Sequence, residues 1–109
     1  MNNAFGLKRK TEQSLVQAQK LIAGGDYAAA EQILKTALDV WRSNSGARQD
    51  EGPLIIGLGK CLEAQRKYED AYELYMESLN NLTGKTYDDV YTSFLYLNER
   101  MGTFTKKDY

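Results

Sequence analysis

The stretch GGDYAAAEQILKTALDVW, residues 24–41, decides the fold, because a looser copy of it begins again at Arg66. The copy, RKYEDAYELYMESLNNL, covers residues 66–82 and places Tyr68 41 residues after Tyr27. Both stretches carry apolar and small residues three and four positions apart, which is the spacing of one helix face. The sequence therefore predicts a similar amphipathic helix after each of the two tyrosines.

The two predicted helices also share the order of side-chain sizes along that face. From each tyrosine the order is aromatic, small, large, small, large, large. The first set is Tyr27, Ala30, Leu34, Ala37, Leu38 and Trp41, and the second is Tyr68, Ala71, Tyr75, Ser78, Leu79 and Leu82. Because amphipathicity alone does not dictate this order, we interpret the chain as containing a repeated structural unit whose core face these residues form.

Helical periodicity extends over most of the chain, so we expect a nearly all-helical protein. The expected helices cover residues 11–23, 26–42, 53–65, 68–82 and 87–101, with the polar linker SNSGARQDEG between the second and the third. Thr11 is expected to cap the first helix, and Pro53 to begin the third. We divide the chain into an N-terminal extension (1–10), a helical repeat domain (11–101) and a tail or the start of a truncated turn (102–109).

Gly59 is the most informative residue in the third predicted helix. It matches Ala18 in the same 41-residue register, as Leu62 matches Leu21. A glycine inside a helix costs roughly 0.5–1 kcal/mol relative to alanine. Gly59 therefore predicts a place where the backbone of a neighbouring helix approaches closely, and Ala30 and Ala71 are the small residues that would face such positions.

The composition excludes several functional classes. A formal net charge of −1 provides no strong field for nucleic acid or an anionic membrane. The chain has no histidine, which removes the usual general base and the commonest metal ligand. The single cysteine, Cys61, cannot form an internal disulfide, and no apolar run is long enough for a signal peptide or a membrane span. We expect a cytoplasmic protein with no enzymatic activity, metal or cofactor, in which Cys61 is a buried small apolar residue.

The repeated residues resemble the signature of the tetratricopeptide repeat family. This signature has a small residue, an apolar residue three positions later, a Gly-x-Tyr turn, and an alanine three positions after the tyrosine. The matching residues are Ala18, Leu21, Gly25, Tyr27, Ala30, Leu34 and Ala37, and then Gly59, Leu62, Arg66, Tyr68, Ala71, Tyr75 and Ser78. The resemblance covers residues 11–82. It implies an all-α fold, a short right-handed α-solenoid of antiparallel helical hairpins with two repeats and a capping helix.

The sequence departs from the family pattern at several places. Arg66 lies where the family favours a glycine, and a left-handed backbone at a non-glycine residue costs roughly 1 kcal/mol. Ser14 and Ile55 occupy the positions of the leading tryptophan. The step of 41 residues exceeds the roughly 34 that are usual, and in this it resembles the kinesin light chain subtype. The last helix resembles the first half of a third repeat, and we interpret it as a cap or as the edge of a longer protein.

The resemblance implies a non-catalytic module for protein–protein interaction, an adaptor or scaffold. In the family, the first helix of each hairpin lines a groove that holds an extended peptide or a partner helix. Carried over to this chain, that lining is Glu12, Leu15, Gln19, Ile22, Ile56, Lys60, Glu63, Thr92, Tyr96 and Glu99. Tyr96 lies off the apolar stripe of the last helix and is the best candidate for an exposed aromatic contact. The mixed charges argue against binding of acidic chaperone tails.

An alternative function is structural self-assembly. With only two and a half hairpins, the end helices present apolar stripes, and large exposed stripes favour association. In this alternative Val90, Phe94 and Met101 are buried across a contact between two subunits of a homo-oligomer.

Overall fold

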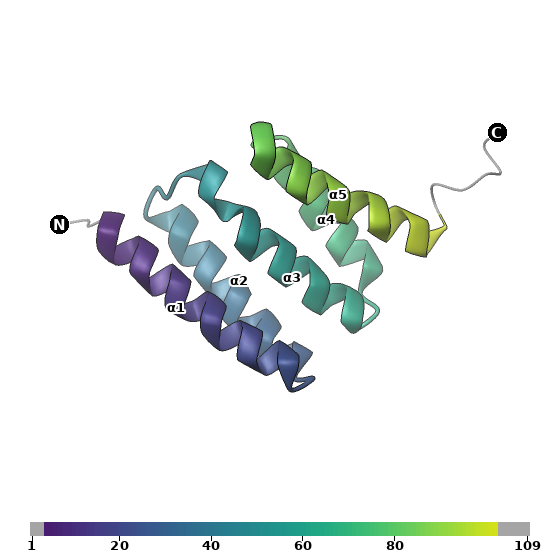
Figure 1. Cartoon of the computed structure of the whole chain (residues 1–109), viewed down its shortest axis with the longest axis horizontal. Coiled ribbons are helices and arrows are strands. Elements are labelled where there is room, and N and C mark those ends of the chain that lie inside the picture. The colour runs from purple at the N-terminus through teal and green to yellow at the C-terminus, as the bar shows by residue number, and fades with distance from the viewer. Residues whose placement is uncertain (1–3, 103–109) are drawn as a thin grey trace.

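The described part of the chain, residues 4–102 of a computed structural model, contains five α-helices and one short 3-10 helix and no strand. The helices are α1 (Ala4–Ala23), α2 (Tyr27–Ser43), η1 (Arg48–Glu51), α3 (Gly52–Ala64), α4 (Tyr68–Leu79) and α5 (Gly84–Met101) (Figure 1). Of the segment 102–109, which we predicted to be a tail or the start of a truncated turn, residues 103–109 lie outside the described residues.

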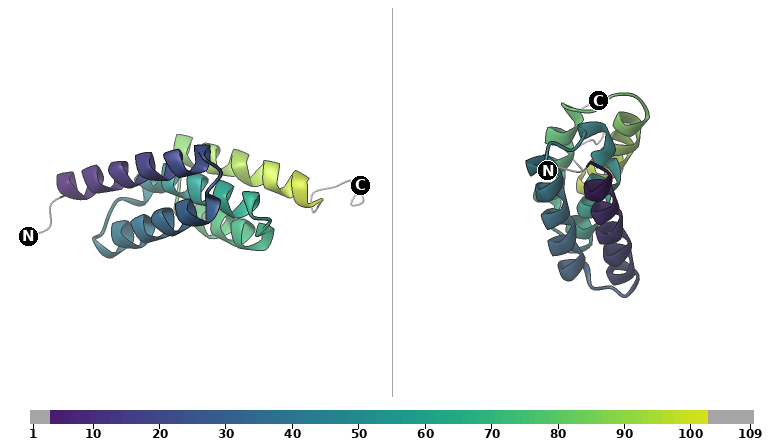
Figure 2. Two further views of the ribbon diagram at one scale, coloured as in Figure 1. Left: turned by 90° about the horizontal axis from the view of Figure 1, so that it is seen from below. Right: turned by 90° about the vertical axis from the view of Figure 1, so that its left-hand side faces the viewer.

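The helices form two layers. Figure 2 shows α1, α3 and α5 in one layer and α2 and α4 in the other. Each helix packs against the next in sequence, and α3 also contacts α1 and α5 across the first layer. The molecule measures 54 × 32 × 19 Å along its principal axes. The prediction of an all-α solenoid of helical hairpins is confirmed.

The core lies between the layers and consists largely of the repeated face predicted from the sequence. In α2, Ala30, Leu34 and Trp41 are buried, and Tyr75 and Ala71 in α4 have no exposed surface. Tyr27 and Tyr68, which begin the two faces, are half-buried at the rim. In α5, Val90 and Leu97 are also fully buried. Val90 is therefore unavailable for a contact between subunits, so the self-assembly prediction was wrong in this detail.

The two hairpin turns have the same backbone conformation, although one contains a glycine and the other an arginine. Gly25 has φ +81° and Arg66 has φ +64°. In the first turn, the amide of Asp26 donates to the carbonyl of Leu21 over 2.8 Å. In the second, the amide of Lys67 donates to the carbonyl of Leu62 over the same distance. The register proposed from the sequence, with Arg66 at the left-handed position, is confirmed.

The space at Gly59 is filled by the Tyr75 side chain of α4, and not by the backbone of a neighbouring helix as the sequence predicted. A Cβ atom on Gly59 would overlap the hydroxyl end of the Tyr75 side chain in α4. The phenol ring of Tyr75 therefore occupies the space that a side chain at position 59 would need. Gly57, for which the sequence offered no explanation, faces Leu34, whose Cδ1 atom would lie 3.2 Å from an added Cβ.

Three predicted helix ends were wrong. α1 begins at Ala4, so residues 4–10, which we assigned to an extension, form its first turns. Thr11 is no N-cap; it lies inside α1, where its hydroxyl donates to the carbonyl of Leu7 over 2.9 Å. α4 ends at Leu79 and leaves Leu82 buried beyond it, and α5 begins at Gly84, three residues earlier than predicted. These ends depend on local contacts that helical periodicity does not report.

The predicted polar linker is an ordered connection. The indole Nε1 of Trp41 donates to the carbonyl of Ala47 over 2.8 Å. Gly46 packs against the Trp41 ring, and a Cβ there would overlap the ring. The linker then forms η1, whose Glu51 carboxylate accepts hydrogen bonds from Arg42 in α2. These contacts hold the two hairpins together at the linker.

Candidate partner-binding groove

α1, α3 and α5 lie side by side and form one face of the molecule (Figures 1 and 2). A pocket of about 390 Å³, which we call the groove pocket, opens between them. Its lining includes Ile22 from α1, Lys60 and Glu63 from α3, and Ser93, Tyr96 and Arg100 from α5. The stacking of hairpins thus brings together side chains that are distant in the sequence.

Glu63 is the centre of a hydrogen-bonded network in the wall of the groove pocket. Its Oε2 accepts a hydrogen bond from the hydroxyl of Tyr75 in α4 over 3.0 Å, and its Oε1 accepts one from Nη1 of Arg100 in α5 over 3.1 Å. Burial and the nearby Glu63 carboxylate raise the pKa of Tyr75 well above its usual range, so the phenol stays protonated and donates. The Glu63 side chain is only 9% exposed. Its main contacts therefore join α3, α4 and α5.

Lys60 and Tyr96 are side chains of the groove pocket that are exposed and available for contacts with another molecule. Tyr96 is 63% exposed, as its position off the apolar stripe predicts, and Lys60 is also exposed. Neither makes a hydrogen bond or ion pair within residues 4–102. Ile22 is half-buried and adds apolar surface to the same pocket. The pocket thus offers an apolar, an aromatic and a cationic group together.

The structure brings four of the predicted groove residues into the groove pocket and places the others elsewhere. Ile22, Lys60, Glu63 and Tyr96 line it. The predicted residues that do not line it are Glu12, Leu15, Gln19, Ile56, Thr92 and Glu99. Of these, Leu15 and Ile56 are half-buried against the core, whereas the remaining four are exposed.

Sequence reasoning missed five residues of the lining. Ser93 and Arg100 could have been found, because they lie three residues before and four residues after Tyr96 and so share its helix face. Ala64 directly follows Glu63 on α3. Tyr27 and Tyr75 belong to the second helices of the hairpins, and they were assigned only to the core. Tyr75 has no exposed surface, and its position behind the pocket wall depends on how the hairpins pack.

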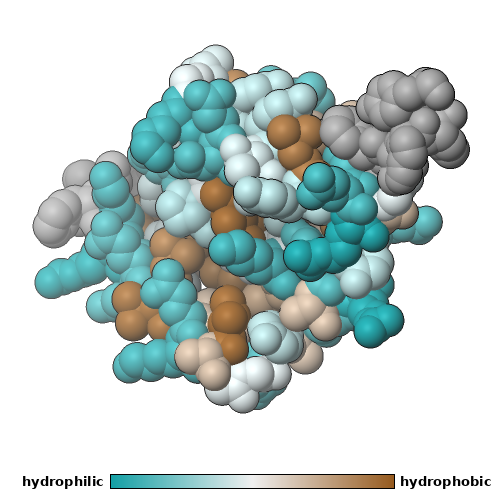
Figure 3. All heavy atoms as spheres, turned by 45° about the vertical axis from the view of Figure 1, so that its right-hand side comes forward, coloured by the Kyte–Doolittle hydropathy of each residue, from teal (hydrophilic) through white to brown (hydrophobic). Residues whose placement is uncertain are grey.

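The surface of the molecule mixes polar and apolar groups. On the face shown in Figure 3, apolar side chains form small patches between hydrophilic ones. Among residues 6–102, the exposed large apolar residues are Val16, Val40, Met76, Tyr91 and Tyr96, and they are spread over four helices. This surface therefore presents apolar and polar groups side by side.

Cys61 has the environment of a packing residue. It is fully buried on α3, and burial, followed by the charge of Glu31, raises the pKa of its thiol. Among residues 4–102, no three histidine, cysteine or acidic side chains lie close enough to hold a metal ion.

None of the helices in the described range has the length and hydropathy that a membrane span requires.

Comparison with known proteins agrees with the geometry. A sequence profile of the tetratricopeptide repeat matches residues 17–83, which is more than half of the chain. This range begins in α1 and ends after α4, so it contains both turns and both copies of the repeated face. Searches of curated proteins and of solved structures find no match. Two stacked hairpins with this signature, and a family match across both of them, show that the chain belongs to the tetratricopeptide repeat family.

Proposed function

We propose that this chain is a non-catalytic adaptor or scaffold module that binds an extended peptide or a partner helix in the groove between α1, α3 and α5. Tetratricopeptide repeats generally mediate protein–protein interactions. The observation that carries the proposal is the groove pocket itself, which all three helices of one layer line with exposed or half-buried side chains. Lys60 and Tyr96 supply the contacts, because neither is used within residues 4–102.

The proposal is tested with a double variant, Lys60→Glu with Tyr96→Ala. Partners that the wild-type chain retains from a native extract are identified, and the affinity for one purified partner is measured by calorimetry. Loss of both contacts is expected to weaken binding by at least about 2 kcal/mol, because exposed aromatic and cationic anchors carry much of an interface's energy. Helix content and melting temperature stay close to those of the wild type, since both side chains are exposed.

A matched control changes the same kinds of residue outside the groove pocket. Lys20→Glu with Val16→Ala alters an exposed lysine and an exposed apolar residue on α1 that lie together on another face. This variant is expected to bind the partner as the wild type does. Equal affinity of the groove variant and the wild type would show that the groove is not the binding surface.

A second candidate function, homo-oligomeric self-assembly, is favoured by the charges of two helices. α1 carries four basic residues and one acidic residue, whereas α4 carries four acidic residues and no basic one. Each also has an exposed apolar residue, Val16 in α1 and Met76 in α4. A contact of α1 with α4 of a second copy would pair these opposite charges. Sedimentation over a hundredfold range of concentration tests it, and a monomer throughout would remove this candidate.

A further inference from the structure

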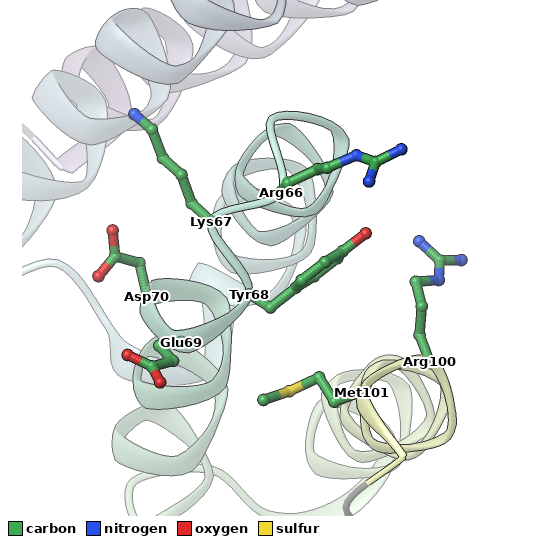
Figure 4. A pocket seen from close by; sticks show the side chains of 7 residues that line it. All are labelled: Arg66, Lys67, Tyr68, Glu69, Asp70, Arg100 and Met101. Atoms are coloured by element: carbon green, nitrogen blue, oxygen red, sulfur yellow. The ribbon is translucent and has the colours of Figure 1, made fainter.

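A second pocket, of about 590 Å³, adjoins the groove pocket at Arg100, which lines both. It lies between the α3–α4 turn, the first turn of α4 and the end of α5. Figure 4 shows the Tyr68 ring directed toward the space between the Arg66 and Arg100 side chains. The pocket thus extends the groove toward the end of α5 and contains two guanidinium groups and a phenol.

Arg66 occupies a backbone conformation that glycine adopts more easily. Its φ of +64° is close to that of Gly25, the equivalent residue of the first turn, and the turn hydrogen bonds have the same pattern. An L-residue with a side chain loses roughly 1–2 kcal/mol in this left-handed region. Ser45, with φ +59°, shares this conformation, so the strain points to a use for the Arg66 side chain only together with its position at the pocket.

The Arg66 side chain has no partner that explains its position. It makes no hydrogen bond or ion pair in the described part of the chain, and it is exposed. The neighbouring Lys67, by contrast, is paired with Glu31 of α2 over 3.1 Å. The guanidinium of Arg66 therefore contributes a free positive charge to the pocket.

Arg100 has donors to spare. One of its nitrogens, Nη1, contacts Glu63, but the side chain is 56% exposed. Because a guanidinium carries five N–H donors, the remaining ones are available to a ligand. The ion pair with Glu63 also holds the Arg100 side chain at the junction of the two pockets.

The acidic residues of the pocket do not neutralise the two arginines. Glu69 and Asp70 also line it, but neither forms an ion pair with Arg66 or Arg100 within residues 4–102. In Figure 4 their carboxylates lie on the other side of Tyr68 from the two guanidinium groups. The Arg66 charge therefore has no acidic partner within residues 4–102, whereas the Arg100 charge is shared with Glu63.

We propose that Arg66, Tyr68 and Arg100 form a subsite for an oxyanion, the carboxylate or phosphate group of the segment that occupies the groove. Guanidinium groups suit this ligand, because their planar N–H pairs match two oxygens of a carboxylate or phosphate. The hydroxyl of Tyr68 adds a third donor. Binding of the anion does not depend on the proposed function. Its assignment to the segment bound in the groove rests on that function.

The test is an NMR titration of the full chain with inorganic phosphate, with acetate and with sodium chloride of matched ionic strength. The signals followed are the arginine Nε–H groups and the backbone amides of residues 65–68 and 99–101. Saturable shifts with phosphate or acetate that chloride does not cause support the subsite. Tighter binding of phosphate identifies a phosphate group as the ligand, and tighter binding of acetate identifies a carboxylate. No saturable shift with either oxyanion would overturn the proposal.

The decisive variant is Arg66→Gly, which removes the guanidinium and fits the left-handed turn. It is expected to raise the midpoint of urea unfolding while weakening the phosphate affinity about tenfold, because a charge-assisted hydrogen bond is lost. Arg9→Gln, at an exposed arginine on α1, serves as the matched control and leaves the titration unchanged. Wild-type phosphate affinity in Arg66→Gly would refute the assignment. Because the titration needs no protein partner, its outcome is independent of the groove experiment.

Discussion

At the scale of single residues, Tyr75 has the widest consequences for the second repeat. Its counterpart in the first repeat is Leu34, and the residues that match Gly59 and Glu63 are Ala18 and Ile22. The phenol is larger than a leucine side chain, and the missing side chain at position 59 makes room for it. Its hydroxyl needs an acceptor in the interior, which Glu63 provides over 3.0 Å.

Gly59→Ala is expected to destabilise the protein because the new methyl group overlaps the Tyr75 phenol. Overpacking of this kind costs about 1–3 kcal/mol, and the higher helix propensity of alanine returns only a part of that. The loss is measured as a lower free energy of unfolding in urea.

Two further variants test this explanation for Gly59. Combining Gly59→Ala with Tyr75→Leu recreates the small and large pair of the first repeat, and it should recover part of the lost stability. Gly24→Ala is the control, since a Cβ there lies no closer than 3.6 Å to its neighbours. Wild-type stability of Gly59→Ala would contradict the proposed steric conflict.

At the scale of elements, two buried carboxylates connect helices that belong to different repeats. Glu51, in η1, is 1% exposed and lies between Arg42 of α2 and Arg48. Glu31, on α2, accepts hydrogen bonds from Gln65 over 2.8 Å and Lys67 over 3.1 Å in the α3–α4 turn. Both carboxylates therefore hold the first hairpin to the second.

Glu51→Gln is expected to lower the free energy of unfolding by about 1–3 kcal/mol, because the two arginines lose a buried charged acceptor. The expected loss in the free energy of unfolding is smaller than for a fully buried ion pair, since both guanidinium groups are partly exposed. Unfolding in urea measures it.

The chain offers a matched control at Glu77, which faces the same arginine. Its carboxylate lies 4.0 Å from Arg42 and its side chain is 67% exposed. Glu77→Gln should therefore change stability by less than about 0.5 kcal/mol. An equal loss in both variants would show that burial of Glu51 adds nothing.

Glu31 is expected to make stability depend on pH. Burial opposes its ionisation, but the hydrogen bonds from Gln65 and Lys67 and the charges of Lys67 and Lys35 outweigh it, so the pKa lies below its ordinary value of 4.5. A lowered pKa in the folded state means that the contribution to stability is present above the unfolded-state pKa and is lost as the pH falls through the folded-state pKa.

The measurement compares the unfolding free energy of the wild type with that of Glu31→Gln at neutral pH and at about pH 3. The wild type should be more stable at neutral pH, and the difference should shrink in acid. Lys67→Gln, which removes the nearest cation, should weaken this pH dependence. If the wild type and Glu31→Gln differ in unfolding free energy by the same amount at both pH values, Glu31 does not make stability depend on pH.

At the scale of the whole molecule, stability is expected to be highest in the middle of the stack. A repeat protein is stabilised mainly by contacts between neighbouring elements. α3 contacts all four other α-helices, whereas α1 contacts only α2 and α3 among the larger interfaces. Native-state hydrogen exchange should therefore show the strongest protection for amides of α3 and weaker protection for α1. Equal protection of α1 and α3 would indicate that the stack unfolds only as one unit.

The sequence by itself determined the helices, the repeated core face and the left-handed turn at Arg66. These features depend on residues within a few positions of one another, and their spacing records which side faces the core. The 41-residue step between matching positions predicted a repeated unit, and the resemblance to the tetratricopeptide repeat implied that the units are stacked hairpins. Helix ends were less predictable, as Thr11 shows, because a threonine can cap a helix or donate inside one.

Only the tertiary structure decided the character of the groove. Glu63 looks in the sequence like a free acidic contact, but Tyr75 and Arg100, 12 and 37 residues away, occupy its carboxylate. Likewise, Trp41 and Glu51 give order to a linker whose composition predicts a loop. Such contacts depend on the relative placement of separate helices, which periodicity within one helix does not encode. For the same reason, Arg66 and Arg100 are recognised as neighbours only once the helices are packed.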